Sequence, residues 1–447
     1  MSASPARAAA FDILLRVEQE DSYASELLHS RHCAGLTPED KGLATELVMG
    51  VLRWRSVLDA GIARVSSQKL DRLDLEVLTA LRMGAYQLGW LERVPARAAI
   101  HESVELVKRA RKRSAAPFAN AVLRRLADNH PSRVTQEELA NAAQDPSALA
   151  SAAAHPEWLV RDWCTVFGIE IARRICTYNQ KVPVTTIRLR TPNAEEELGR
   201  EGITVARGSL LNGARRIVSG DVTKTHAFAD DHVVIQDEAS QLVAALVGEG
   251  SRILDCCAAP GGKTWAVADR NPNATVLAVE LHPHRVELLR KRVHARNVQF
   301  LHADIRELPV DQRFDRVLVD APCSGTGTIG RNPEIKWRLA PRDIADLQAR
   351  QIAILEAGMR HVAKDGKLIY STCSLQREEG EEVVAKALEA NPQVRLLDMG
   401  SDLKTLREKH QMSADAGHEL IRGSFLRTIP GLKPCDGFFV SALQRVE

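Results

Sequence analysis

The chain has 447 residues, of which 45% are apolar and 26% are charged, and its formal net charge is +2. This length exceeds what one hydrophobic core usually serves, so two or three domains are expected, and the composition excludes a disordered or fibrous chain. The balanced charge excludes a uniformly basic nucleic-acid-binding protein, so any such surface must be local.

Residues 1–135 are predicted to form an all-α bundle. The stretches RAAAFDILLRV, ATELVMGVLRW and LEVLTALRMGAYQLGWL repeat apolar residues at helical spacing. Thr37 and Pro38 are typical of a helix start, with a capping side chain followed by proline in the first turn. Residues 131–154 are polar and Ala-rich with two prolines, so we expect a linker or a weak helix there.

The opening residues show no signal-peptide pattern, and no stretch approaches the roughly 20 apolar residues of a membrane span. The eight cysteines show neither paired CxxC spacing nor the rhythm of a disulfide framework. We therefore expect a cytoplasmic protein with no membrane partner and no metal site, in which thiols stay reduced.

A basic run lies near the end of the predicted bundle. It reads KRARKR and contains Lys108, Arg109, Arg111, Lys112 and Arg113. Contacts from such residues to RNA phosphates supply affinity without sequence information. A solvated helix face explains the run equally well, so both interpretations stay open.

Residues 155–235 are predicted to form a small α+β module that binds RNA or serves as a linker. Helical PEWLVRDWCTVFG is followed by the strand-like runs VTTIRLRT and GITVAR. Gly202, Gly208, Gly213 and Gly220 divide this segment into turns.

Residues 236–447 alternate short apolar runs with helical stretches. The runs are SRILDC, ATVLAVE, VQFLHAD, RVLVDAP and KLIYSTC. This alternation predicts an α/β domain with a parallel sheet and helices on both faces. Ligands in such sheets bind beyond the carboxyl ends of the strands, where the polar residues of these runs fall.

The loop after the first strand of this domain has the features of a cofactor site. It contains Cys257, Ala258, Ala259, Pro260, Gly261, Gly262 and Lys263. Small residues let the backbone approach a ligand, and the helix behind them offers free N–H groups. The next two strands lead to Glu280 and Asp304, whose carboxylates can accept ribose hydroxyls and an adenine amine. Any one of these acids could equally cap a helix, but Asp255, Glu280 and Asp304 at successive strand ends beside a glycine loop together indicate a nucleoside-containing cofactor.

The same loop does not match the common phosphate-binding sequences. The GxGxxG pattern of dinucleotide sites is absent, and Cys257 stands where a P-loop would have its first glycine. S-adenosylmethionine contains no phosphate, so these exclusions favour it as the cofactor.

Two cysteines follow the fourth and fifth predicted strands, Cys323 in DAPCSGTG and Cys373 in YSTCS. Neighbouring strands lie about 4.8 Å apart, so both thiols are expected at one rim of the sheet, beside the cofactor. A single cysteine there is more simply a small buried apolar residue. Two of them in polar turns beside Asp320 indicate covalent catalysis instead.

Two thiols suit the methylation of carbon 5 of a cytosine, which is a poor nucleophile. A thiolate that adds to carbon 6 makes carbon 5 enamine-like and able to take a methyl group. The proton on carbon 5 must then leave before the first thiol is released, and a second group can help that release. Asp320 could favour the charged adduct by contacting N3 and the exocyclic amine.

The motifs described above resemble those of the RsmB/NOP family of RNA cytosine-C5 methyltransferases, and especially its bacterial members that act on 16S rRNA. DCCAAPGGKT, DAPCSGTGTIGRNPEIKW, YSTCS and the upstream QDEASQLV carry the resemblance, which spans essentially the whole chain. It implies a Rossmann-like class I methyltransferase domain that uses S-adenosylmethionine, preceded by a NusB-like RNA-binding bundle that includes FANAVLRRL. It also implies 16S rRNA, naked or in an early small-subunit particle, as the partner, with no obligate protein partner.

The resemblance implies residue roles as well. Cys373 would be the nucleophile and Cys323 the thiol that aids release. The run 257–263 would line the cofactor, with Glu280, Asp304 and Asp320 as further contacts.

This sequence departs from the family pattern at a few positions. Glu280 replaces a usual aspartate but keeps the carboxylate, and Cys256 replaces a usual leucine and is expected to be a core residue. Asn332 replaces a frequent histidine directly after Arg331, a candidate RNA contact, so the substrate contacts of that loop stay open.

Two other functions compete with this interpretation. DNA cytosine-C5 methyltransferases use the Pro-Cys cysteine as nucleophile and lack a partner like Cys373, which argues against that class. A non-catalytic RNA-binding or antitermination protein built on the NusB-like bundle would need neither a complete cofactor loop nor two thiols.

Overall fold

The computed structural model describes residues 3–20, 22–129, 134–142, 144–414, 416 and 418–446. The chain divides into two compact units. The first comprises Met1–Val182 together with Ile329–Arg338, and the second comprises Pro183–Thr328 together with Leu339–Glu447.

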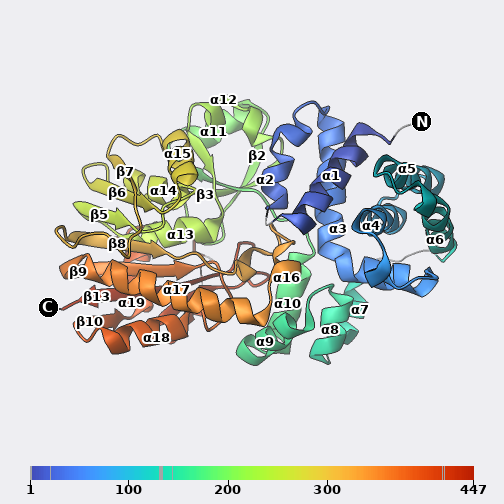
Figure 1. The fold of residues 1–447 in the computed structure, drawn as a ribbon. Helices are drawn as coiled ribbons and strands as arrows, with labels where there is room; N and C mark the ends of the chain where they lie inside the picture. The colour runs from blue at the N-terminus through green and yellow to red at the C-terminus, as the bar shows by residue number, and fades with distance from the viewer. Residues whose placement is uncertain are drawn as a thin grey trace. The chain divides into compact units, whose positions relative to one another are not determined.

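The described part of the first unit is built from α-helices and short 3₁₀ turns (Figure 1). Its α-helices are α1 (Pro5–Gln19), α2 (Ala24–Leu28), α3 (Pro38–Val65), α4 (Leu75–Trp90), α5 (Ala96–Arg109), α6 (Ala116–Asp128), α7 (Gln136–Ala142), α8 (Pro146–Ala152), α9 (Glu157–Phe167), α10 (Ile169–Asn179) and α16 (Ile335–Arg338). The predicted all-α bundle is confirmed. Thr37 caps α3 as expected, because its Oγ1 accepts a hydrogen bond from the Asp40 N–H at 3.2 Å.

The first unit is held together by the apolar faces of α1, α3, α4, α5 and α6. Phe11, Leu47 and Leu81 are almost completely buried where these faces meet. Burying one side chain of this size contributes roughly 1.5–3 kcal/mol. Of the predicted linker 131–154, residues 131–133 and 143 lie outside the described residues, and the rest contains α7 and α8.

The segment 155–235, expected as one module, is divided between the two units. Its helices α9 and α10 pack with the first unit, and its strands belong to the second. The strands β1 (Thr186–Leu189), β2 (Thr204–Arg207), β3 (Ala214–Ser219) and β4 (Val233–Ile235) form an antiparallel sheet in the order β2-β3-β1-β4, accompanied by α11 (Ala194–Arg200) and α12 (His226–Ala229). Arg188 and Arg190 of this module both pair with Asp269 of the helix α14 (Gly262–Arg270), at 2.6 and 2.8 Å.

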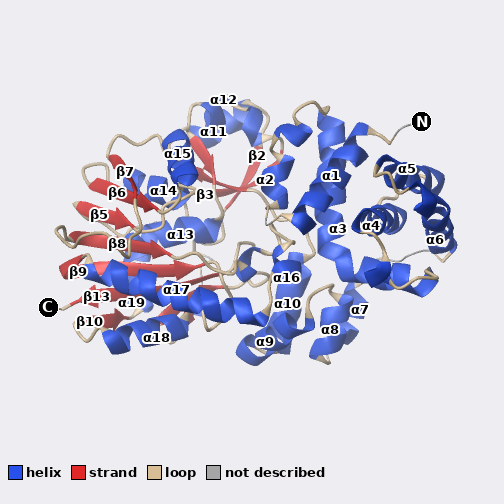
Figure 2. Cartoon of the chain, in the orientation of Figure 1, coloured by secondary structure: helices blue, strands red, loops and turns tan. Residues whose placement is uncertain are grey.

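The main sheet of the second unit is mixed (Figure 2). Its strands are β5 (Arg252–Asp255), β6 (Thr275–Glu280), β7 (Val298–His302), β8 (Phe314–Asp320), β9 (Val362–Thr372), β10 (Val394–Leu397), β11 (Ile421–Arg422), β12 (Phe425–Thr428) and β13 (Phe438–Arg445). The five predicted strands, β5 to β9, are parallel and stand in the order β9-β8-β5-β6-β7. The sequence did not reveal the antiparallel part, in which β13 pairs with β9, β10 and β12.

Helices cover both faces of this sheet, as predicted. The helices are α13 (Glu238–Val247), α14 (Gly262–Arg270), α15 (Pro283–Arg292), α17 (Pro341–Arg360), α18 (Glu381–Ala390) and α19 (Met399–Glu408). Ile253, Leu318 and Ile369 pack in one core cluster with α13, α14 and α19. Their strand neighbours Leu254 and Val317 pack in another with α17 and α18, because successive strand residues point to opposite faces.

The segment Ile329–Arg338 packs in the first unit, although it follows the Cys323 turn in sequence. Lys336 is fully buried there, and its ammonium donates to the carbonyls of Arg53 at 2.8 Å and Ala154 at 2.6 Å. The Trp337 indole N–H donates to the Leu52 carbonyl at 2.6 Å. The expected catalytic domain 236–447 therefore contributes one segment to the helical unit.

Gly50 of α3 is a sensitive position in the helical unit. A Cβ there would overlap the ring of Tyr86 on α4, whereas a Cβ at Gly42 of the same helix meets nothing within 4 Å. We expect Gly50→Ala to destabilise the unit by about 2 kcal/mol through overpacking. Gly42→Ala should be neutral or stabilising by up to about 1 kcal/mol, because alanine favours the helix.

Thermal unfolding followed by tryptophan fluorescence measures both variants. Five of the six tryptophans lie in the first unit, so the signal reports mainly on it. Equal melting temperatures for the two variants would contradict the close contact between α3 and Tyr86.

Candidate functional site

The candidate site lies at the carboxyl edge of the five parallel strands. Asp255, Glu280 and Asp320 are the last residues of β5, β6 and β8, and Asp304 follows β7 by two residues. Parallel pairing places these ends at one edge, as the register shows where Asp320 of β8 stands opposite Ser371 of β9. The predicted site residues of the second unit are therefore brought together.

The loop between β5 and α14 provides a tight backbone turn. Gly261 has φ +106°, a conformation that favours glycine, and a Cβ there would approach Val293 Cγ2 to 2.6 Å. Helix α14 begins at Gly262, so its first N–H groups face the end of the loop. The chain thus presents free backbone donors directly behind the small residues 257–261.

Carboxylates surround this loop. Glu280 is 5% exposed and accepts from the backbone N–H groups of His282 at 3.0 Å and Ala259 at 3.4 Å. Asp304 accepts from the Arg306 guanidinium at 2.9 Å, and this hydrogen bond lowers the pKa of Asp304. Burial raises the pKa of Asp255 to about 7, even though the Thr264 hydroxyl donates to it at 2.7 Å.

Asp320 connects the loop to the thiol region. Its two oxygens accept from Lys263 Nζ and from Ser371 Oγ, each at 2.7 Å. Burial alone would lower the pKa of Lys263, but the charge of Asp320, the hydrogen bond to it and the smaller effects of Cys373 and Asp255 together outweigh burial, so the pKa lies above its usual range. Lys263 is thus a cation already neutralised by Asp320 and not a free phosphate ligand.

The two predicted thiols are in contact. Cys323 Sγ lies 3.2 Å from Cys373 Sγ, and the Gly327 N–H donates to the Cys373 carbonyl at 2.9 Å, which ties the two turns together. The hydrogen bond with Cys373, followed by burial and nearby charges, raises the pKa of the Cys323 thiol well above its usual range. Cys323 therefore keeps its proton at neutral pH and can donate it toward the Cys373 sulfur.

The other cysteines of this region have different surroundings. Cys256 is buried in the core under α17, as expected. Burial also raises the pKa of the Cys257 thiol well above its usual range. Both side chains therefore stay as neutral thiols.

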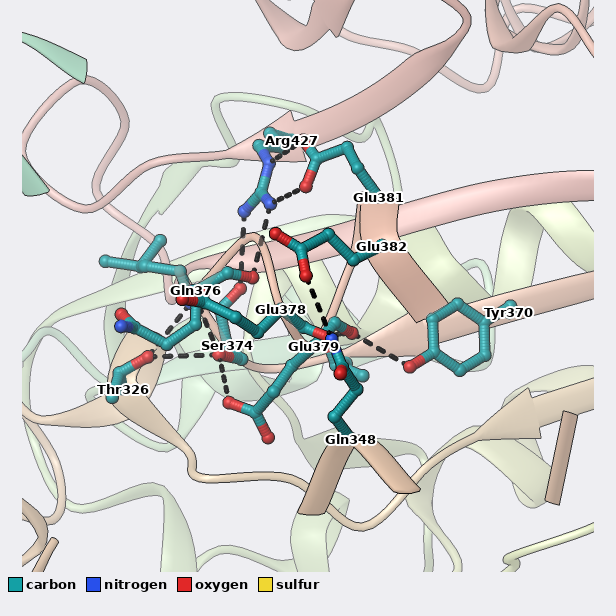
Figure 3. A network of polar contacts seen from close by, with 12 residues as sticks. Thr326, Gln348, Tyr370, Ser374, Gln376, Glu378, Glu379, Glu381, Glu382 and Arg427 are labelled. Carbon is teal, nitrogen blue, oxygen red and sulfur yellow. Dashed lines mark hydrogen bonds and ion pairs between the residues drawn. The ribbon is translucent and has the colours of Figure 1, made fainter. Parts of the chain in front are cut away.

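Sequence reasoning missed a buried carboxylate, Glu379, which contacts the turns that carry Cys323 and Cys373; Figure 3 shows it beside Ser374. Glu379 accepts from the Ser374 hydroxyl at 2.6 Å and from the Ser324 backbone N–H at 2.8 Å. Gln351 of α17 also donates to it at 2.8 Å. The only signal in the sequence was the acidic run REEGEE, which looks like a solvated helix start.

The candidate RNA contacts are placed in the first unit. Within the basic run, Lys108 pairs with Glu105 and Arg109 with Asp12, each at 2.7 Å. Lys112 pairs with Asp74 at 3.1 Å, while Arg111 and Arg113 are exposed. Arg331 is half-buried in the segment 329–338.

The donor set suits a cationic nucleoside. Carboxylates end three adjacent strands, and the one lysine of the loop is paired. Such an edge accepts hydrogen bonds from hydroxyls and amines and attracts positive charge, which fits S-adenosylmethionine better than a phosphorylated cofactor. No group of three or more His, Cys, Asp or Glu among the described residues is arranged to hold a metal. Within that same part of the chain, no helix has both the length and the apolarity to cross a membrane.

Comparison with known proteins gives two matches to family models. Residues 244–444 match the family described as 16S rRNA methyltransferase RsmB/F, and residues 4–128 match the NusB family.

Individual relatives cover most or all of the chain. A Bacillus subtilis protein named "Probable ribosomal RNA small subunit methyltransferase B" is 34% identical over 465 residues, covering 100% of both chains. A Serratia proteamaculans protein named "Ribosomal RNA small subunit methyltransferase B" is 31% identical over 385 residues, covering 83% of this chain and 87% of its own.

Two solved structures share the fold. The crystal structure of PH0851 matches with TM-score 0.78 and 22% identity over 100% of both chains. That of a methyltransferase homolog protein from Pyrococcus horikoshii matches with TM-score 0.55 and 24% identity, covering 70% of this chain and 99% of its own.

The raised pKa of Asp255 predicts a pH dependence of stability. Because its folded pKa of about 7 exceeds the unfolded value of about 3.9, its contribution is complete below pH 4 and is lost as the pH rises to 7. At about 1.4 kcal/mol per pKa unit, the loss is at most about 4 kcal/mol.

Asp255→Asn removes this titration and keeps an oxygen for Thr264. Urea unfolding of both proteins between pH 4 and pH 8 should therefore show a smaller decline for the variant. Parallel pH profiles would show that Asp255 ionises normally in the folded protein.

Proposed function

Because the chain belongs to the RsmB/F family of rRNA methyltransferases, with a NusB-family domain ahead of the methyltransferase domain, we propose that it methylates carbon 5 of a cytosine in 16S rRNA. The observation that carries the cytosine assignment is the 3.2 Å contact between Cys323 Sγ and Cys373 Sγ beside the acid-lined loop. A single nucleophile would not require a second thiol in contact with it. In contrast, addition of one thiolate to carbon 6 followed by assisted release requires a second group beside the nucleophile, and the second thiol can be that group.

The run 257–263, Glu280 and Asp304 hold the methyl donor S-adenosylmethionine. When bound, this cofactor supplies an electrophilic methyl group on a sulfonium sulfur. The free N–H groups at the start of α14 and the carboxylate of Glu280 suit its polar groups. Asp304 can accept a hydrogen bond from a nucleoside amine once its hydrogen bond with the Arg306 guanidinium is broken.

Cys373 bonds to carbon 6 of the cytosine as a thiolate. The S–H of Cys323 donates to the Cys373 sulfur and stabilises its negative charge before the attack. As the sulfur–carbon bond forms, N3 of the base takes a proton from solvent. The adduct is then a neutral enamine, and the carboxylate of Asp320 stabilises the positive charge that N3 and the exocyclic amine share once carbon 5 is methylated.

Cys323 then assists release. Once Cys373 is bonded to carbon, its sulfur is a poorer hydrogen-bond acceptor, which weakens the largest cause that raises the pKa of Cys323, the hydrogen bond with Cys373. Cys323 now loses its own proton to solvent and can take the proton from carbon 5 of the methylated adduct. The C5–C6 double bond re-forms, the bond from sulfur to carbon 6 breaks, Cys373 leaves as a thiolate, and N3 returns its proton to solvent.

The target cytosine enters the site of the second unit, and other parts of the RNA contact the helical unit. Arg111, Arg113 and Arg331 are candidate contacts, together with Lys108, Arg109 and Lys112 after exchange of their present acidic partners. Pairs that are this exposed are weak, so phosphates can replace the carboxylates at little cost.

Single replacements of the two cysteines test the thiol roles. Cys373→Ala should reduce turnover at least about 10³-fold, because no group is left to activate carbon 5. Cys323→Ala should still form the bond to carbon 6 but release it slowly. A protein–RNA complex that survives denaturing electrophoresis should therefore accumulate.

Cys164→Ala in α9 serves as the control and should keep turnover within about twofold, since Cys164 lies in the helical unit. Accumulation of adduct in Cys373→Ala and full loss in Cys323→Ala would reverse the roles, as in DNA cytosine methyltransferases.

Glu280→Gln tests the cofactor site by isothermal calorimetry with S-adenosylmethionine. Loss of a charge-assisted hydrogen bond should weaken binding by roughly 10- to 100-fold. Glu287→Gln, on the exposed side of α15, should bind as the unchanged protein does. No measurable binding by the unchanged protein would favour the non-catalytic RNA-binding alternative.

A further inference from the structure

The side chain of Glu379, which lies outside the motifs described above, forms hydrogen bonds to both turns that carry the thiols, the one after β8 with Cys323 and the one after β9 with Cys373. Oε2 of Glu379 accepts from the Ser374 hydroxyl at 2.6 Å and also from the Ser324 hydroxyl. Its Oε1 accepts from the Ser324 N–H and from Gln351 Nε2, each at 2.8 Å. Ser324 directly follows Cys323, and Ser374 directly follows Cys373.

Hydrogen bonds also hold the backbone of Glu379 and the backbone next to Cys323. Its carbonyl accepts from the Tyr370 hydroxyl at 2.8 Å, near the end of β9 (Figure 3). Gln351 also donates to the carbonyl of Pro322 at 2.9 Å, just before the first cysteine. Residues of β9 and of α17 therefore hold Glu379 and the residue before Cys323 at the sheet edge from which the thiols extend.

Glu379 is fully buried, and no lysine or arginine pairs with it in the part of the chain that the structure describes. Its charge is compensated by four hydrogen-bond donors, which use all the acceptor positions of a carboxylate. Burying an anion without a cation is costly, and replacing such a group with apolar residues is often neutral or stabilising. Stability alone is therefore a weak reason for a carboxylate here.

We propose that Glu379 is the positioning residue of the thiol pair: its carboxylate clamps the Ser324 and Ser374 turns together and so sets the separation and orientation of Cys323 and Cys373. The expected effect of Glu379 on turnover rests on the proposed function, whereas its expected effect on the separation and orientation of the two thiols does not. An amide at this position keeps only one accepting oxygen, so it can accept from two of the four donors, and its NH2 group would face the other two. An aspartate is one methylene too short to reach both turns.

The nearby Glu382 offers a matched control. It lies three residues further along the chain, and its carboxylate accepts from the neutral Gln348 side chain at 3.1 Å rather than from either cysteine turn. Glu382→Gln therefore makes the same chemical change in the same region without loosening the clamp.

Disulfide formation measures the thiol geometry without any need for activity. Diamide, a diazene oxidant, takes up the two thiol hydrogens as the sulfurs join, and mass spectrometry identifies the Cys323–Cys373 peptide pair. Because a disulfide requires a narrow geometry, the rate depends on how the turns are held. We expect Glu379→Gln and Glu379→Asp to slow this cross-link at least tenfold, and Glu382→Gln to stay within twofold.

Turnover is measured on the same proteins. The proposal predicts that both Glu379 variants lose kcat by at least tenfold, while KM for RNA and for S-adenosylmethionine changes less than threefold. Slow cross-linking with unchanged turnover would support the clamp and overturn the two-thiol function. Unchanged cross-linking overturns the clamp, whatever happens to turnover.

Circular dichroism and melting curves show whether the Glu379 variants fold. If they do not, Ser324→Ala and Ser374→Ala each remove one arm of the clamp and leave the carboxylate in place. Each should slow the cross-link at least threefold, and a rate equal to that of the unchanged protein in both would overturn the proposal.

Discussion

The parallel pairing of β8 with β9 is the constraint on which the site depends. Its register sets Asp320 opposite Ser371, so the turns that follow the two strands leave the sheet side by side. The two cysteines on those turns come into contact at 3.2 Å, although 50 residues separate them in sequence. The proposed mechanism needs two groups this close to act in turn on one base, and adjacent parallel strands provide that spacing.

Electrostatics then give the two thiols different characters. Cys323 keeps its proton because of its hydrogen bond with Cys373 and its burial, so the pair holds one shared hydrogen bond instead of two independent thiols. The carboxylates at the strand ends make the adjoining loop a place for positive charge, and Lys263 is already neutralised by Asp320. The same edge therefore suits a cationic methyl donor and a transiently cationic base.

Much of this was determined by the sequence itself. Helical spacing in residues 5–130 predicted the bundle, and the five apolar runs predicted β5 to β9, because periodicity and strand-end chemistry are local properties. Cys323, Cys373, Glu280 and Asp320 could be proposed as site residues because each follows or ends a strand whose neighbours could be inferred. Expected roles could thus be attached to residues before any distance was known.

Tertiary structure decided the rest, because long-range pairing leaves no local pattern. The antiparallel strands from β10 to β13, the division of 155–235, and the packing of Ile329–Arg338 in the helical unit all depend on partners distant in sequence. Glu379 is the clearest case. Its acidic run resembles a solvated helix start, and only the folded chain buries it against both serines. The sequence thus predicted which groups carry the chemistry, and the fold determined what holds them together.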